Sequence, residues 1–210
     1  MVVLTATCAA LYAAILIPFK VVQIIPGITE IRPANAIPIV CSLLFGPAGA
    51  WGAAFGNVIG DFFGGLGPGD LFGFARNLLY GLVPYAVWEA TTRMEPVPES
   101  PRQWAGLLGV IVLAAALCAS VIGWGLQILQ FQVFTVLGTF VFVNNVVAGA
   151  ILAPLLLTVL YPRIRRARLL YRDLLGPRAP RPVWRMALGL VLLVAGTTAA
   201  VTAGELFAAG

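Results

Sequence analysis

The sequence predicts an all-α integral membrane protein, and its composition is the first reason. Of its 210 residues, 60% are apolar and only 10% are charged, whereas soluble domains average roughly 45–50% apolar and about 25% charged residues. The second reason is a series of nearly uncharged segments of about twenty residues, the length that crosses the hydrocarbon core of a bilayer. The third is that most arginines lie in two connections between apolar segments. That placement indicates membrane orientation rather than a nucleic-acid-binding surface.

The first half of the chain contains three of the expected spans. Residues 2–19 form an apolar segment with no basic residues before it, so we interpret it as a retained span rather than a signal peptide. A polar, proline-containing stretch, 20–32, follows. The next thirty or so apolar residues are too many for one untilted crossing. The pair Gly46-Pro47 therefore divides them into two helices, 34–45 and 47–63.

The second half of the chain contains four more expected spans. A glycine-rich loop, 64–69, leads into a fourth span, 70–91, and a linker with three prolines leads into a fifth, 104–129. Two glutamines mark a tight turn into a sixth, 133–161. A basic segment then precedes a last apolar run, 186–207. The expectation is a six-helix bundle plus one extra C-terminal transmembrane helix.

This pattern predicts three parts and an orientation. Residues 1–161 would form the membrane domain, 162–185 a basic connection and 186–210 the additional transmembrane helix. Ten of the thirteen basic residues lie in the connections after the fourth and sixth spans. The positive-inside rule makes that side cytoplasmic, so the N-terminus is expected in the cytoplasm and the C-terminus outside.

Several kinds of chemistry are excluded by what the chain lacks. There is no histidine, the commonest general base and metal ligand. The single lysine, Lys20, is not in a phosphate-binding loop, and the three cysteines have no C-x-x-C spacing. We therefore expect no cofactor, no metal and no enzymatic activity. A membrane enzyme would have to rely on Glu30, Asp61 and Glu89, and an assembly or scaffold subunit is the other alternative.

Polar side chains within the spans are expected to converge on one outward-opening layer. An intramembrane charge costs roughly 2.5–3.5 kcal/mol on the insertion scale, so Asp61 and Arg76 should pair with each other or with a bound molecule. A channel would have polar groups in both halves of the membrane, and the inner halves here have almost none. The alternative for each amide is a structural hydrogen bond between helices. The residues of this layer are Asn35, Asn57, Asp61, Arg76, Asn77, Gln127, Gln130, Asn144 and Asn145.

The first span also carries a face of small residues. Ala6, Ala10 and Ala14 recur every four residues, a spacing that lets another helix approach closely. The partner could be a separate protein or one of the chain's own helices. The sequence is compatible with both partners.

These features together resemble the substrate-binding S components of energy-coupling-factor (ECF) vitamin transporters. The similarity lies in six spans within about 160 residues, in the alanine face, and in the small-residue runs 29–38, 44–53 and 56–61. The resemblance implies high-affinity capture of a vitamin or related micronutrient at the cell membrane of a prokaryote. It also implies docking through the alanine face on a membrane coupling subunit driven by two ATPases.

The ligand class is less determined by the residues. The pair Glu30 and Arg32 in the first outer loop is similar to that of S components for queuosine precursors. Cobalamin-related precursors are the alternative ligand class. A pocket with an acid, a base, several amides and nearby aromatic residues such as Trp124 suits a planar, polar heterocycle. The predicted ligand-binding set therefore adds Glu30, Arg32 and Trp124 to the polar layer.

Overall fold

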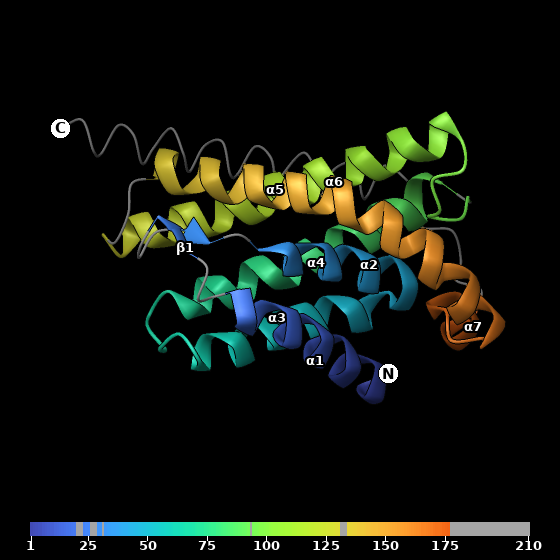
Figure 1. Ribbon diagram of the computed structural model, residues 1–210, viewed down its shortest axis with the longest axis horizontal. Coiled ribbons are helices and arrows are strands. Elements are labelled where there is room, and N and C mark those ends of the chain that lie inside the picture. The colour runs from blue at the N-terminus through green and yellow to red at the C-terminus, as the bar shows by residue number, and fades with distance from the viewer. Residues whose placement is uncertain (20–22, 26–28, 31, 93, 131–133, 177–210) are drawn as a thin grey trace.

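The computed structural model is a bundle of long helices, and it describes residues 1–19, 23–25, 29–30, 32–92, 94–130 and 134–176 (Figure 1). The all-α class and the apolar character of the helices are confirmed. A hairpin of β1 and β2 and a short 3₁₀ helix, η1, accompany the helices. The elements are α1 (Val2–Phe19), β1 (Gln23–Ile25), β2 (Thr29–Glu30), η1 (Pro33–Asn35), α2 (Ala36–Phe45), α3 (Pro47–Phe62), α4 (Asp70–Thr91), α5 (Pro101–Ile128), α6 (Phe134–Arg166) and α7 (Tyr171–Leu175).

Three described segments are long and apolar enough to cross a membrane: Val2–Phe19, Pro101–Ile128 and Leu137–Leu175. The helices α2 and α3 are shorter, with 10 and 16 residues. They are separated at Gly46, whose φ of +60° is a conformation that favours glycine. Pro47 then begins α3, a position where its missing N–H costs nothing. The break that the sequence predicts at Gly46-Pro47 is therefore present.

Close approach between α1 and α3 depends on two glycines. A Cβ atom at Gly52 would lie 2.3 Å from Cys8 Cβ, and one at Gly56 would lie 2.7 Å from the carbonyl oxygen of Ala9. The two backbones can touch only because these positions have no side chain. In a bilayer, where apolar side chains gain nothing by leaving lipid, such close packing drives helix association.

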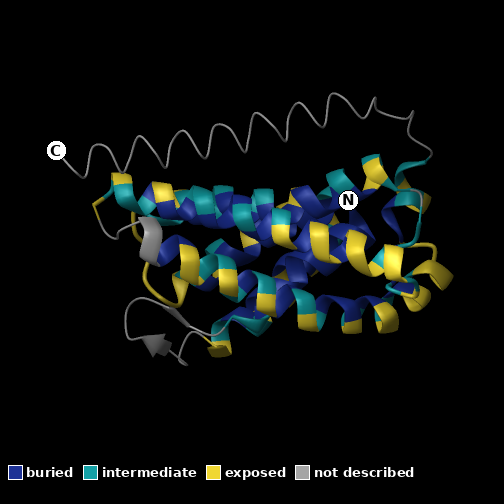
Figure 2. Ribbon diagram, turned by 90° about the horizontal axis from the view of Figure 1, so that it is seen from above, coloured by how far each residue is buried: buried dark blue, intermediate teal, exposed yellow. Residues whose placement is uncertain are grey.

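The centre of the bundle is α2. All ten of its residues are buried, and it packs against α3, α4 and α6. Buried residues lie in the interior of the bundle, and exposed residues lie on its outer faces (Figure 2). A helix that is apolar all round belongs in such a position.

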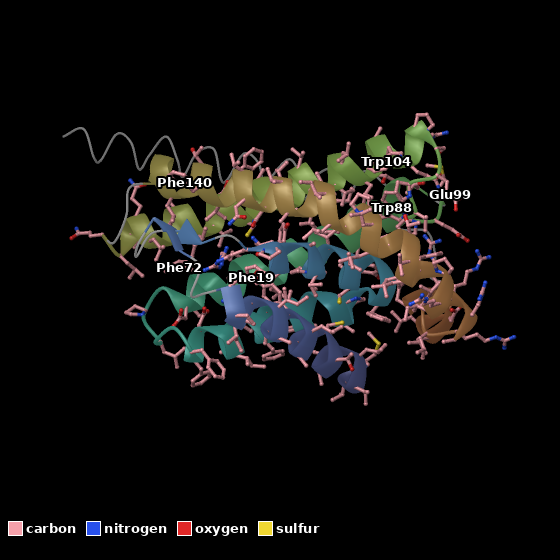
Figure 3. All side chains as sticks on the ribbon, viewed as in Figure 1. Phe19, Phe72, Trp88, Glu99, Trp104 and Phe140 are labelled. Atoms are coloured by element: carbon pink, nitrogen blue, oxygen red, sulfur yellow. The ribbon has the colours of Figure 1, made fainter. Side chains whose placement is uncertain are left out.

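The connections gather at two opposite ends of the bundle. The hairpin, the loop between α3 and α4, and the end of α5 lie at one end, and α7 lies at the other (Figure 1). The side chains of Trp88, Glu99 and Trp104 lie toward the α7 end, whereas Phe72 lies toward the hairpin end (Figure 3). This arrangement separates the polar ends and leaves the apolar lengths of the helices between them.

Three local features were not expected from the sequence. The polar stretch after α1 contains the hairpin, and the basic connection contains α7. Tyr171 of α7 packs edge-on against Tyr85 of α4, with ring centroids 5.0 Å apart, and α6 continues to Arg166, beyond the expected end at residue 161. The expected seventh span, 186–207, lies outside the described residues.

Candidate ligand-binding site

A cavity of about 220 Å³ lies at the hairpin end of the bundle, between η1, α3, α4, α5 and α6. The wall has a polar part and an apolar part, and the apolar part consists of aliphatic residues of α5 and α6. The lining residues are Arg32, Asn35, Asn57, Asp61, Gly69, Asp70, Gly73, Arg76, Ile122, Leu126, Leu137, Val141, Asn144 and Asn145.

A network of buried amides and tyrosines forms the inner boundary of this cavity. The hydroxyl of Tyr12 lies 3.2 Å from Asn77 Oδ1 and 3.5 Å from Asn35 Oδ1. Asn35 Nδ2 in turn donates to Asn145 Oδ1 at 2.5 Å, and the hydroxyl of Tyr80 donates to the Asn145 carbonyl at 3.3 Å. The network connects α1, η1, α4 and α6, because these five side chains come from four separate elements. It holds two lining amides, Asn35 and Asn145, in place.

A second polar group lies on α3. Asn57 and Asp61 are one helical turn apart and therefore share a face, and Asn57 Nδ2 donates to Asp61 Oδ2 at 2.5 Å. Gly73 of α4 faces them, and a Cβ atom there would lie 3.1 Å from Asn57 Nδ2. The absence of a side chain at Gly73 lets α4 approach this pair and leaves the cavity open beside it.

Arg76 brings a guanidinium group into the wall although the side chain is only 6% exposed. Its Nη1 lies 3.7 Å from Cys118 Sγ, a weak acceptor. A buried guanidinium needs nearby groups that compensate its charge. Asp61 lines the same cavity, so charges of both signs border the space.

Three buried polar atoms of the wall have no hydrogen-bond partner among the described residues. They are Asn57 Oδ1, Arg76 Nε and Asn145 Nδ2, one acceptor and two donors. Buried polar atoms are almost always paired, and each unpaired one costs about 1–3 kcal/mol. All three atoms belong to residues that line one cavity, where a polar molecule could pair with them.

Residues 2–162 match the profile of the family described as QueT transporter. The chain belongs to the QueT transporter family. The match covers α1 to α5 and nearly all of α6. QueT proteins are ECF-type S components for queuosine precursors, so the resemblance to S components is confirmed, and the family implies a membrane transport component rather than an enzyme. Comparisons with curated proteins and with solved structures found no match.

Much of the predicted polar layer of this QueT family member meets at the cavity. Seven of the residues selected from the sequence line it: Arg32, Asn35, Asn57, Asp61, Arg76, Asn144 and Asn145. Asn77 lies just behind the wall, 1% exposed, and donates to the Gly73 carbonyl at 2.9 Å. It supports the wall without lining it.

Other predicted residues lie elsewhere. Trp124 is 42% exposed and is not part of the cavity wall. Gln127 and Gln130, at the end of α5, also lie outside the wall. Glu30 is in β2, and its side chain is outside the described residues. Within the described part of the wall there is no aromatic ring, so the expected stacking surface is absent there.

Sequence reasoning did not select Tyr12, Cys118 or Asp70, nor the aliphatic wall. Tyr12 is the one polar-tipped aromatic residue in an apolar first span, and that contrast was the available signal. The aliphatic residues of α5 and α6 gave none, because a side chain that lines a cavity and one that packs against a neighbouring helix have the same chemistry.

The alanine face of α1 is open to the surroundings of the molecule. Ala6, Ala10 and Ala14 are exposed, whereas Ala9 and Ala13 are buried. Ala9 and Ala13 therefore pack against the chain's own described helices. The face of Ala6, Ala10 and Ala14 remains available for another helix.

Proposed function

We propose that this QueT family member captures a queuosine precursor with high affinity and is the substrate-binding subunit of an ECF-type transporter. The observation that carries the proposal is the set of three buried, unpartnered polar atoms around one cavity, on Asn57, Arg76 and Asn145. A ligand that paired all three would remove the cost of leaving them unsatisfied.

The cavity size supports a small ligand. Its volume of about 220 Å³ is below the range of about 300–1,000 Å³ that is usual for drug-sized molecules. A single planar heterocycle fits such a space, and this favours a queuosine precursor over the larger cobalamin-related precursors.

The polar pattern supports a heterocycle that has both donors and acceptors on its edge. Asn57 Oδ1 requires a donor, whereas Arg76 Nε and Asn145 Nδ2 require acceptors. An N–H group flanked by a ring nitrogen and a carbonyl provides such a set. The aliphatic wall of Leu126 and Val141 would cover the faces of the ring.

The proposed orientation places the cavity toward the outside of a prokaryotic cell. The hairpin end of the bundle contains the cavity, and the arginine-rich end contains α7 (Figure 1). By the positive-inside rule the arginines face the cytoplasm, which puts the N-terminus in the cytoplasm as well. In this arrangement residues 1–161 are the substrate-binding domain, 162–185 the cytoplasmic connection and 186–210 an additional membrane span.

The proposed partner contact is the exposed face of Ala6, Ala10 and Ala14. Small residues four apart allow the close helix contact on which association in lipid depends. We propose that the coupling subunit of the ECF transporter, with its ATPases, docks there.

Calorimetry on the purified full-length chain tests the ligand. We expect saturable binding of queuosine precursors and none of a panel of unrelated vitamins. Asn57→Leu and Asn145→Leu should each weaken binding at least tenfold, and Trp124→Leu, outside the wall, should not. If folded protein binds none of the precursors, the scaffold alternative gains and the transport proposal fails.

A further inference from the structure

The arginines at the end of α6 and in α7 fall into two groups. Arg165 forms an ion pair with Glu95, and Arg172 Nη2 lies 3.2 Å from Glu89 Oε2. The hydroxyl of Tyr171 also donates to that carboxylate. These two arginines are thus used to fasten the end of α6 and α7 to α4 and the following linker.

The second group is Arg163, Arg166 and Arg168. All three are exposed, and none has a carboxylate partner among the described residues. Arg163 and Arg166 lie three residues apart in the last turn of α6 and are neighbours on its surface. Arg168 follows in the turn, with a φ of +56°. Between Pro162 and Gly176 the one acidic residue is Asp173, on α7.

Two exposed leucines follow these arginines in the sequence. Leu169 is 41% exposed and Leu174 is 45% exposed, although the chain passes here from an apolar span into its most polar segment. Trp104, 41% exposed, lies at the same end of the bundle (Figure 3). Exposed tryptophans mark the level of the lipid headgroups.

We propose that Arg163, Arg166 and Arg168 form a binding surface for the phosphate groups of anionic phospholipids, with Leu169 and Leu174 inserted beside them. Unpaired guanidinium groups at headgroup level bind phosphate through charge and hydrogen bonds. Lipid fits this surface better than an acidic protein does, because α6 leads directly from the hydrocarbon region into it and the neighbouring leucines are apolar. Arg165 and Arg172 contribute little, since carboxylates already neutralise them.

Native mass spectrometry of the full-length chain in detergent, titrated with phosphatidylglycerol or phosphatidylcholine, tests the surface. Each arginine near a charged membrane contributes roughly a fivefold gain in affinity. The variant R163Q/R166Q/R168Q should therefore retain phosphatidylglycerol on the order of a hundredfold less well. E95Q/R165Q, which removes the neutralised ion pair at the same end of α6 and keeps the net charge, is the control, and it should retain the lipid within about twofold. Phosphatidylcholine should bind weakly to all of these proteins.

A second measurement keeps the test decisive if the triple variant does not fold. Retention of phosphatidylglycerol by the unaltered protein should fall steeply as salt rises, because the interaction is electrostatic. R163K/R166K/R168K should keep most of the binding. Equal retention of both lipids, or full retention by the glutamine variant, would overturn the proposal and leave an acidic protein as the candidate partner.

Discussion

The hydroxyl of Tyr12 on α1 lies 3.2 Å from Asn77 Oδ1 on α4, and the two residues are 65 positions apart in the sequence. Tyr12 is completely buried, and the same hydroxyl lies 3.5 Å from Asn35 Oδ1. One side of α1 thus joins the amide network behind the cavity, while Ala10 and Ala14 on the same helix are exposed. The helix that carries the proposed docking face is therefore hydrogen-bonded, through Tyr12, to two residues at the cavity wall.

We expect Tyr12→Phe to weaken this connection without emptying the core. The ring remains, but Asn77 and Asn35 lose the hydroxyl, which should lower the free energy of unfolding by about 1–3 kcal/mol. Affinity for the ligand should also fall, because Asn35 is less firmly placed. Melting temperature and calorimetry measure the two effects. Tyr161→Phe, a buried tyrosine in the last part of α6, is the control and should change affinity very little.

Asp61 and Arg76 allow a double-mutant test of the charged part of the wall. Asp61 accepts from Asn57, and Arg76 contacts Cys118, so each has a partner of its own. We therefore expect Asp61→Asn and Arg76→Gln each to lower ligand affinity, and the double variant not to restore it. Each single variant should also lower the melting temperature, because a buried partner loses its contact.

A purely structural ion pair would give the opposite result. Removing one charge would then cost several kcal/mol, and removing both would recover much of the loss. Unchanged affinity in all three variants would remove both residues from the proposed site.

The α1–α3 contact gives a prediction about stability alone. Gly52→Ala places a methyl group where Cys8 Cβ is 2.3 Å away, so the helices must separate. We expect a loss of about 1–3 kcal/mol, the usual cost of overpacking. Gly109→Ala on α5, where the added Cβ meets nothing within 4 Å, is the matched control and should be neutral or slightly stabilising. Equal melting temperatures for the two variants would show that α1 and α3 are not held by this contact.

The sequence predicted the helices well because the signals for them are local. Apolar length gave the spans, and Gly46-Pro47 gave the break between α2 and α3. The depth of each polar residue within its span brought Asn35, Asn57, Asp61, Arg76 and Asn145 to one place, because helices of known direction fix depth. All five line the cavity.

The other site residues could not be predicted, because whether a side chain faces the cavity depends on the rotation of its helix about the helix axis. Depth alone does not determine that rotation. Trp124 is at a suitable depth, but it is exposed on α5, whereas Ile122 and Leu126 of the same helix line the cavity. The docking of α7 was also not predictable. It depends on Tyr171 meeting Tyr85 and Glu89 across more than eighty residues of sequence.

The last prediction separates the two faces of α1. Ala10 and Ala14 are exposed, and Ala13 is 4% exposed. Ala10→Trp together with Ala14→Trp should therefore leave folding and ligand affinity close to normal, because neither side chain enters the core. The same variant should no longer co-purify with a coupling subunit and should not support uptake, since a bulky residue prevents close helix contact. Ala13→Trp is the contrasting control, and it should lower the melting temperature because no space exists between α1 and its neighbours. Uptake that survives the double tryptophan variant would show that the coupling subunit docks elsewhere, while the ligand-binding proposal would stand unaffected.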